Sequence, residues 1–289
     1  FHNLLFFKLE INKYLSLSSV NKKTLLNELK YSIPLIPNQL SLWVMNSSDR
    51  LIVSFILGTA ANGILAVSHK FPAIFMTFFN IFQLAWHETG TVHFFDKDRD
   101  DFFSKTIEEI MLLFSTLCMC IIIVLPIVFN LFVNSSYNEA YYNIPIYLIA
   151  SLLNVMVGLL GVVYVATKKT FEIAKTTIIA ALINIIVNII LIKYIGLYAA
   201  SISTFMGYFI TMIYRIIDTK KYLNIKYSLY KYVKIIVGIL FSTIIYYINN
   251  KLISIITLPF FICIALWVNK DYIVLIKKLI KGKKPYMIL

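Results

Sequence analysis

The feature that most restricts this chain is a series of long apolar stretches that follow one another with short connections. A helix crosses the hydrocarbon core of a bilayer with roughly 20 predominantly apolar residues. The windows that meet this length or approach it are residues 33–58, 64–86, 107–132, 146–166, 176–195, 198–217, 235–249 and 252–268. The sequence therefore predicts an all-α, polytopic transmembrane helix bundle of about eight spans.

Composition supports this fold class and excludes an ordinary soluble domain. Of the 289 residues 60% are hydrophobic and only 14% are charged, whereas a soluble domain is about 25% charged. The three cysteines, Cys118, Cys120 and Cys263, all lie within apolar windows. They are predicted to be packing residues, because nothing in this placement indicates a disulfide framework.

Basic residues are distributed unevenly over the connections. Of the 27 Lys and Arg residues, 23 lie before the first window or after the second, fourth, sixth and eighth, a count that includes Arg215. The other connections hold only Lys193 and Lys251, and Arg50 and Lys70 lie inside windows. The positive-inside rule places both ends of this arrangement in the cytoplasm. The net charge of +13 therefore indicates topology and contact with membrane lipids, with no nucleic-acid partner.

Two adjacent charged residues, Asp49 and Arg50, lie well inside the first window. A charge at that depth costs roughly 2.5–3.5 kcal/mol on insertion scales. At 100° per residue Asn38, Ser41 and Asp49 share one face, flanked by Asn46 and Arg50. One hypothesis is a static packing device in which the charges are neutralised by each other or by neighbouring helices. The other is a translocation path in which Arg50 attracts an anionic headgroup and Asp49 orients it or carries a coupling cation.

The second window adds further candidates for the substrate path. Lys70 lies near its outer end, where it either snorkels to the interface or faces a cavity. Asn80 and Gln83 are three residues apart, share a face and are predicted to line the inner half of a cavity. Trp86 is predicted to be an interfacial belt residue.

The sequence offers little for catalysis or metal binding. His87 and His93 are six residues apart, whereas a zinc-binding H-E-x-x-H helix has its histidines four apart on one face. The connections on the outer side are short, so no extracytoplasmic catalytic domain is expected. We predict neither an enzyme nor a metal site.

Small and amide side chains recur at helical spacing in the later windows. Asn184 and Asn188 lie one turn apart and are predicted to form hydrogen bonds between helices. Small or polar residues three or four apart are predicted to let helices approach closely: Asn154, Gly158 and Gly161, then Ala200, Ser203, Thr204 and Gly207. Prolines inside windows, at 72, 126 and 259, are expected to kink their helices.

Several segments carry a resemblance when their order and spacing are taken together. They are Tyr31 through Pro34 to Ser48-Asp49-Arg50-Leu51, then Gly58, Gly63 and His69-Lys70-Phe71; Gln83-Leu84-Ala85-Trp86; Ala166-Thr167-Lys168-Lys169-Thr170 with Ile183-Asn184-Ile185-Ile186-Val187-Asn188; and Gly196-Leu197-Tyr198-Ala199-Ala200-Ser201-Ile202-Ser203-Thr204. Over about residues 30–220 the chain resembles the Wzx-type polysaccharide flippases of the multidrug/oligosaccharidyl-lipid/polysaccharide exporter superfamily.

The resemblance implies a family pattern of about fourteen helices, with two six-helix lobes around a central cavity and a terminal helix pair. Residues 1–30 would be the end of a truncated helix and a cytoplasmic linker. Residues 31–217 would form the second lobe, and residues 218–289 the terminal pair and a basic cytoplasmic tail. Since the chain begins at Phe1 within an apolar run, we expect it to be a C-terminal fragment.

The same resemblance implies a function. It is the translocation of an undecaprenyl-diphosphate-linked oligosaccharide repeat unit across the bacterial cytoplasmic membrane, by alternating access, for O-antigen or capsule biosynthesis. An H⁺ or Na⁺ gradient would drive it, and no other cofactor is expected. Other polysaccharide assembly proteins are candidate partners. The alternatives are a multidrug antiporter of the same superfamily, a flippase for peptidoglycan precursors and a non-transporting scaffold in polysaccharide assembly.

Overall fold

The computed structural model describes residues 21–270, apart from the side chain of Asn46. Within this range every regular element is a helix and there is no strand, so the all-α prediction is confirmed there. Residues 1–20 and 271–289, which include the predicted helix remnant and most of the basic tail, lie outside the described residues. The same holds for the side chain of Asn46, one of the predicted path residues.

The helices coincide with the predicted windows and extend beyond several of them. They are α2 (Lys22–Ser32), α3 (Leu35–Leu57), α4 (Thr59–Ser68), α5 (Lys70–His93), α6 (Arg99–Phe132), α7 (Ala140–Ala166), α8 (Thr170–Ile195), α9 (Tyr198–Thr219), α10 (Leu229–Ile248) and α11 (Lys251–Val268), with one 3₁₀ turn, η2 (Ser135–Tyr137). Among the described residues seven helical segments are long and apolar enough to cross a membrane, or eight if α4 and α5 form one broken span.

The second predicted window differs from the structure because it is broken. α4 and α5 meet at His69 with a bend of 42°. Pro72 lies in the first turn of α5, where its missing N–H would have had no helical partner in any case. The break is therefore placed before the proline, and Pro72 does not kink the helix from within as the sequence predicted. Pro126 and Pro259 do lie inside their helices, α6 and α11.

Several helices end at residues whose backbone conformation or side-chain hydrogen bonds terminate a helix. α3 stops at Gly58 with φ of 93°, a left-handed conformation that only glycine adopts without strain. Asn249 ends α10 in the left-handed region, and the next residue, Asn250, accepts hydrogen bonds from the first main-chain N–H groups of α11. These two asparagines form the whole connection between α10 and α11, in which the chain reverses direction.

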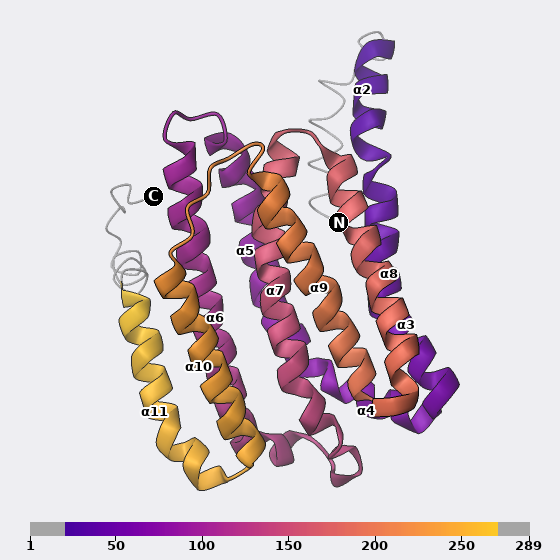
Figure 1. Cartoon of the computed structure of the whole chain (residues 1–289), viewed down its shortest axis with the longest axis vertical. Helices are drawn as coiled ribbons and strands as arrows, with labels where there is room; N and C mark the ends of the chain where they lie inside the picture. Colours follow the sequence, from indigo (N-terminus) through magenta and orange to yellow (C-terminus); the bar gives the residue numbers. More distant parts are fainter. Residues whose placement is uncertain (1–20, 271–289) are drawn as a thin grey trace, which may run out of the picture.

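The connections gather at the two ends of the bundle (Figure 1). The α5–α6, α7–α8 and α9–α10 connections leave from the end where α2 lies, and the α3–α4, α6–α7, α8–α9 and α10–α11 connections lie at the other. The first set carries the basic residues Lys97, Lys168, Lys169, Lys220 and Lys221. The alternation predicted from charge is therefore reproduced in space as one basic end and one weakly charged end.

The helices pack in two groups that meet along α7 and α9. On one side α8 packs against both α3 and α9; on the other α7 packs against α5 and α6, and α10 and α11 pack against α6. In Figure 1 α10 and α11 lie on the opposite side of the molecule from α3 and α8. The terminal pair therefore packs against α6, on the side of the molecule away from α3.

Aromatic side chains fill the core between α5, α6 and α7. The rings of Phe75, Phe79 and Phe82 meet Phe114 at centroid distances of 5.3–6.1 Å. Trp86 belongs to this core, because its side chain is 2% exposed and its Nε1–H donates to the Leu159 carbonyl at 3.0 Å. The prediction that Trp86 is an interfacial belt residue was wrong, because its indole is buried in the core and its N–H is bonded to a carbonyl of α7.

Candidate functional site

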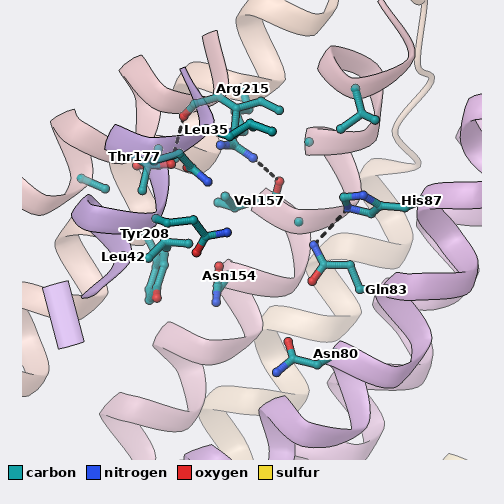
Figure 2. Close-up of a pocket in the computed structure, with 18 of the residues that line it drawn as sticks. Leu35, Leu42, Asn80, Gln83, His87, Asn154, Val157, Thr177, Tyr208 and Arg215 are labelled. Carbon is teal, nitrogen blue, oxygen red and sulfur yellow. Dashed lines mark hydrogen bonds between the residues drawn. The ribbon is translucent and has the colours of Figure 1, made fainter. Parts of the chain in front are cut away.

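A cavity of about 590 Å³ opens between α3 and α5. Its walls come from α3, α5, α7, α8 and α9. Figure 2 shows Asn80, Gln83 and His87 along α5 on one side, facing Leu35 and Leu42 of α3 on the other. Asn38 and Gln39 of α3 and Met76 and Phe79 of α5 also line it, so both sides of the cavity carry polar and apolar side chains.

The α5 side of the cavity contains two of the residues predicted for the substrate path. Asn80 is exposed and Gln83 is half-buried, and both line the cavity. Gln83 Nε2 lies 3.4 Å from His87 Nε2, one turn further along the same face. This row presents amide and imidazole groups that can donate or accept hydrogen bonds.

Small residues on α7 let neighbouring side chains approach the cavity closely. A Cβ atom added at Gly158 would lie 2.8 Å from the ring of Phe79, and one added at Gly161 would lie 2.9 Å from Nη1 of Arg215. Both glycines line the cavity, as does Asn154. Gly161, which the sequence assigned to close packing, therefore also makes room for an arginine at the cavity wall.

Arg215 carries a full positive charge at the wall of this cavity. Its side chain is 4% exposed, and its Nη1 donates to the Val157 carbonyl at 2.8 Å. Nε and Nη2 both donate to Thr176 Oγ1, at 3.2 and 2.8 Å. A guanidinium has five N–H donors, and the other two have no partner among the described residues.

The charge of Arg215 also lacks a counter-ion. Within residues 21–270 no carboxylate oxygen lies within 4.0 Å of its guanidinium. The ring of Tyr164 lies 5.7 Å from the guanidinium carbon and supplies only a cation–π contact. A buried cation without an anionic partner is costly, and this position lines an open cavity that an anion can enter.

The carboxylate nearest in sequence, Asp218, is committed elsewhere. It accepts from the hydroxyl of Tyr164 at 2.9 Å and from Nζ of Lys221 at 2.5 Å. This contact with the carboxylate raises the pKa of Lys221 above its usual value. Asp218 thus closes a small network at the basic end of α9 and leaves Arg215 free for another anion.

The sequence missed Arg215, because it was counted among the cytoplasmic anchors at the end of its window. That interpretation was wrong: the residue lies inside α9 and is buried. A usable signal was present, since Ser203, Gly207, Thr211 and Arg215 follow at four-residue steps and lie on one helix face. All four are buried, and Arg215 contacts Val157 on α7 and Thr176 on α8.

A second polar site surrounds Asp49, whose side chain is 1% exposed. Its Oδ1 accepts from Asn188 Nδ2 at 2.7 Å and from Ser203 Oγ at 3.4 Å, and its Oδ2 accepts from Thr204 Oγ1 at 2.8 Å. Asn184 donates from Nδ2 to both hydroxyls, at 3.2 and 3.1 Å. We call these five residues the Asp49 cluster.

The Asp49 cluster joins three helices. Asn184 also accepts from Ser48 on α3 at 3.0 Å, so α8 contacts α3 and α9 through one side chain. The predicted interhelical hydrogen bonds of Asn184 and Asn188 are confirmed. The predicted pairing of Asp49 with Arg50 is not observed among the described residues; neutral donors surround the carboxylate instead.

The remaining predicted path residues lie elsewhere. Arg50 and Lys70 are exposed, and neither they nor Asp49 line the cavity. The structure therefore brings Asn80 and Gln83 to the cavity, puts Asp49 in a separate buried cluster beside it, and adds Arg215. Within the described part of the chain no three His, Cys, Asp or Glu residues are grouped to hold a metal ion, and all three cysteines are free thiols.

Comparison with known proteins adds no relative: the chain matches no protein-family model, no curated protein and no solved structure. Function is therefore inferred from the residues of the cavity and of the Asp49 cluster.

Proposed function

We propose that this chain forms one wall of the translocation path of a polysaccharide flippase in the bacterial cytoplasmic membrane. Its substrate would be an undecaprenyl-diphosphate-linked oligosaccharide repeat unit, carried across by alternating access for O-antigen or capsule biosynthesis. In this arrangement the basic end and the C-terminus face the cytoplasm. Activity would come from binding and conformational change, without an enzymatic step.

One observation carries the proposal: Arg215 is a buried cation at the wall of an open cavity, and within residues 21–270 it has no carboxylate partner and two of its N–H donors are unused. A diphosphate offers several anionic oxygens in the spacing that a guanidinium binds as a fork. The apolar residues of α3 across the cavity provide a surface for a lipid chain. A headgroup with a polyprenyl tail uses both walls at once.

The charge at the cavity also supports this function over the multidrug alternative. A cationic drug would meet the charge of Arg215, which repels it, and the α5 side of the cavity offers amides and one imidazole but no carboxylate. Anionic cargo is consequently the better fit. Asn80 and Gln83 can donate to sugar or phosphate oxygens near the headgroup.

The test is complementation in cells that lack their own flippase. We expect Arg215→Met to abolish surface polysaccharide at normal expression, Arg215→Lys to retain part of it, and Lys175→Met to leave it intact. Lys175 is a matched control because it is an exposed cation near the same end, bonded to Tyr214. Normal surface polysaccharide in Arg215→Met would contradict the proposal. If Arg215→Met loses surface polysaccharide while the export complex still assembles, the chain acts as a transporter and not as a scaffold.

A further inference from the structure

A second cavity, of about 400 Å³, lies at the weakly charged end of the bundle, where the α3–α4, α6–α7 and α8–α9 connections gather (Figure 1). Its walls come from the ends of α3, α4, α7, α8 and α9. It shares no lining residue with the cavity at Arg215 or with the Asp49 cluster. Tyr198, which lines it, and Arg215 lie about 26 Å apart along α9. The second cavity is therefore a separate candidate site.

Two exposed tyrosines line the second cavity, Tyr142 on α7 and Tyr198 on α9. Their phenol groups lie within electrostatic range of each other. Each residue accepts a hydrogen bond at its main-chain carbonyl, but within residues 21–270 neither phenol hydroxyl has a partner. A phenol hydroxyl can both donate and accept, and the face of an aromatic ring is partially negative, which attracts C–H groups. The pair therefore offers a ligand two free hydroxyls and aromatic surface.

Two further polar side chains, Asn143 and Glu139, complete the lining. Asn143 is 2% exposed, and its Oδ1 accepts from Ser201 Oγ at 2.9 Å. Its Nδ2 has no partner among the residues that the structure describes, although buried polar groups are nearly always hydrogen-bonded. Glu139 is exposed and forms no ion pair within residues 21–270. A ligand with acceptor oxygens satisfies the amide, and a ligand with hydroxyl groups satisfies the carboxylate.

The charge and the hydrogen-bonding groups of the second cavity exclude two other kinds of ligand. No Lys or Arg of the described residues lines it, and Glu139 adds a negative charge, which repels a phosphate group. The diphosphate proposed for Arg215 therefore does not fit here. A quaternary ammonium ion binds to aromatic rings, but it forms no hydrogen bonds and would leave the amide of Asn143 and both phenols unpaired.

We propose that the second cavity is a binding site for a neutral saccharide. A sugar carries hydroxyls that donate and accept hydrogen bonds, and its ring has a C–H face that packs on aromatic side chains. The amide of Asn143 donates to a sugar oxygen, Glu139 accepts from sugar hydroxyls, and Tyr142 and Tyr198 supply aromatic surface and free hydroxyls. A volume of about 400 Å³ falls within the range of roughly 300–1,000 Å³ that is usual for small-molecule sites.

The saccharide has two possible sources, a free sugar and the sugar part of a lipid-linked repeat unit. In the proposed orientation the weakly charged end faces away from the cytoplasm. The second cavity then receives the sugars of the repeat unit on the outer side, after the headgroup has been bound at Arg215 in the other half of the bundle. This step rests on the proposed function; the saccharide site does not.

Saturation-transfer difference NMR of the protein in lipid nanodiscs tests the saccharide site. The probes are free neutral hexoses, N-acetylhexosamines and the disaccharides built from them. We expect at least one sugar to bind, with affinity reduced about tenfold or more in Tyr198→Ala and less in Tyr198→Phe, which keeps the ring. Tyr194→Ala is the matched control and should bind as the wild type does, because Tyr194 is an exposed tyrosine at the same end that does not line the cavity. Glu139→Gln should keep most of the affinity, because an amide oxygen still accepts from hydroxyls.

Three results would overturn the saccharide site. The first is that no sugar of the panel binds. The second is an equal loss in Tyr194→Ala and Tyr198→Ala, which would make these tyrosines an interfacial aromatic belt. The third is binding of tetramethylammonium in place of sugars, abolished by Glu139→Gln, which would make the cavity an organic-cation site.

Surface polysaccharide in cells distinguishes the two sources of sugar. If the site receives the repeat unit, Tyr198→Ala should reduce surface polysaccharide at normal expression and leave the affinity for undecaprenyl diphosphate unchanged. Normal polysaccharide in Tyr198→Ala would overturn that step and assign the site to free saccharides. Sugar binding together with normal polysaccharide in Arg215→Met would keep the saccharide site and remove the proposed function. Lost polysaccharide in Arg215→Met without any sugar binding would do the reverse.

Discussion

Asn184 is predicted to be the residue on which the packing of α3, α8 and α9 most depends. Its side chain is fully buried and makes three hydrogen bonds of 3.0–3.2 Å, to Ser48 on α3 and to Ser203 and Thr204 on α9. Interhelical hydrogen bonds of membrane proteins average about 0.6 kcal/mol. Asn184→Ala should therefore lower the free energy of unfolding by about 2 kcal/mol.

Reversible unfolding in mixed detergent micelles measures this change. Asn154→Ala is the matched control, because it deletes the same amide, whose one hydrogen-bond partner among the described residues is the sulfur of Met76, at 4.0 Å; its effect should stay within about 0.5 kcal/mol. A double-mutant cycle of Asn184→Ala with Ser48→Ala should give a coupling of about 0.6 kcal/mol. Equal stability of the Asn184 and Asn154 variants, with no coupling to Ser48, would refute the reasoning.

Two further substitutions test the cavity wall and the terminal helix pair. Gly161→Ala should push the guanidinium of Arg215 aside, since the new Cβ lies 2.9 Å from Nη1, and should weaken binding of a polyprenyl diphosphate about tenfold. Gly63→Ala, whose Cβ would meet only a 3.5 Å contact, should leave that affinity unchanged; equal losses in both would contradict the assigned contact. Tyr246→Phe deletes a buried hydroxyl that donates to an α7 carbonyl and should destabilise the protein by about 1 kcal/mol in the unfolding assay. Tyr247→Phe, which deletes an exposed one, should cost less, and the reverse order would show that α10 is not held to α7 in this way.

The helices could be predicted from the sequence because a bilayer-spanning helix leaves a long apolar signal. Their ends could not, because a helix continues for several residues into charged sequence. α6 begins at Arg99 rather than at residue 107, and the intervening residues include Asp100, Asp101 and Lys105, which hydropathy excludes from a span. The break at His69 could not be predicted either, because it carries no glycine and lies inside an apolar window.

Residues of the candidate site could be predicted only where the face of a single helix decides whether a side chain reaches the cavity. Asn80 and Gln83 share a face of α5 and both reach the cavity. The environment of Asp49 depends on residues about 140 to 155 positions away, which no local pattern specifies. Arg215 was missed because a basic residue near a helix end has the same local sequence whether it reaches water or turns inward between α7 and α8.

The central claim is that Arg215 binds the anionic headgroup of a lipid-linked substrate, and direct binding tests it most simply. Affinity for undecaprenyl diphosphate would be measured for the purified protein in nanodiscs, with Arg215→Met, Arg215→Lys and Lys175→Met. Two charge-assisted hydrogen bonds at about 1.5–3 kcal/mol each predict a loss of roughly 10²- to 10⁴-fold for Arg215→Met. Arg215→Lys should fall between, and Lys175→Met should match the wild type. Equal affinity of the wild type and Arg215→Met would contradict the account.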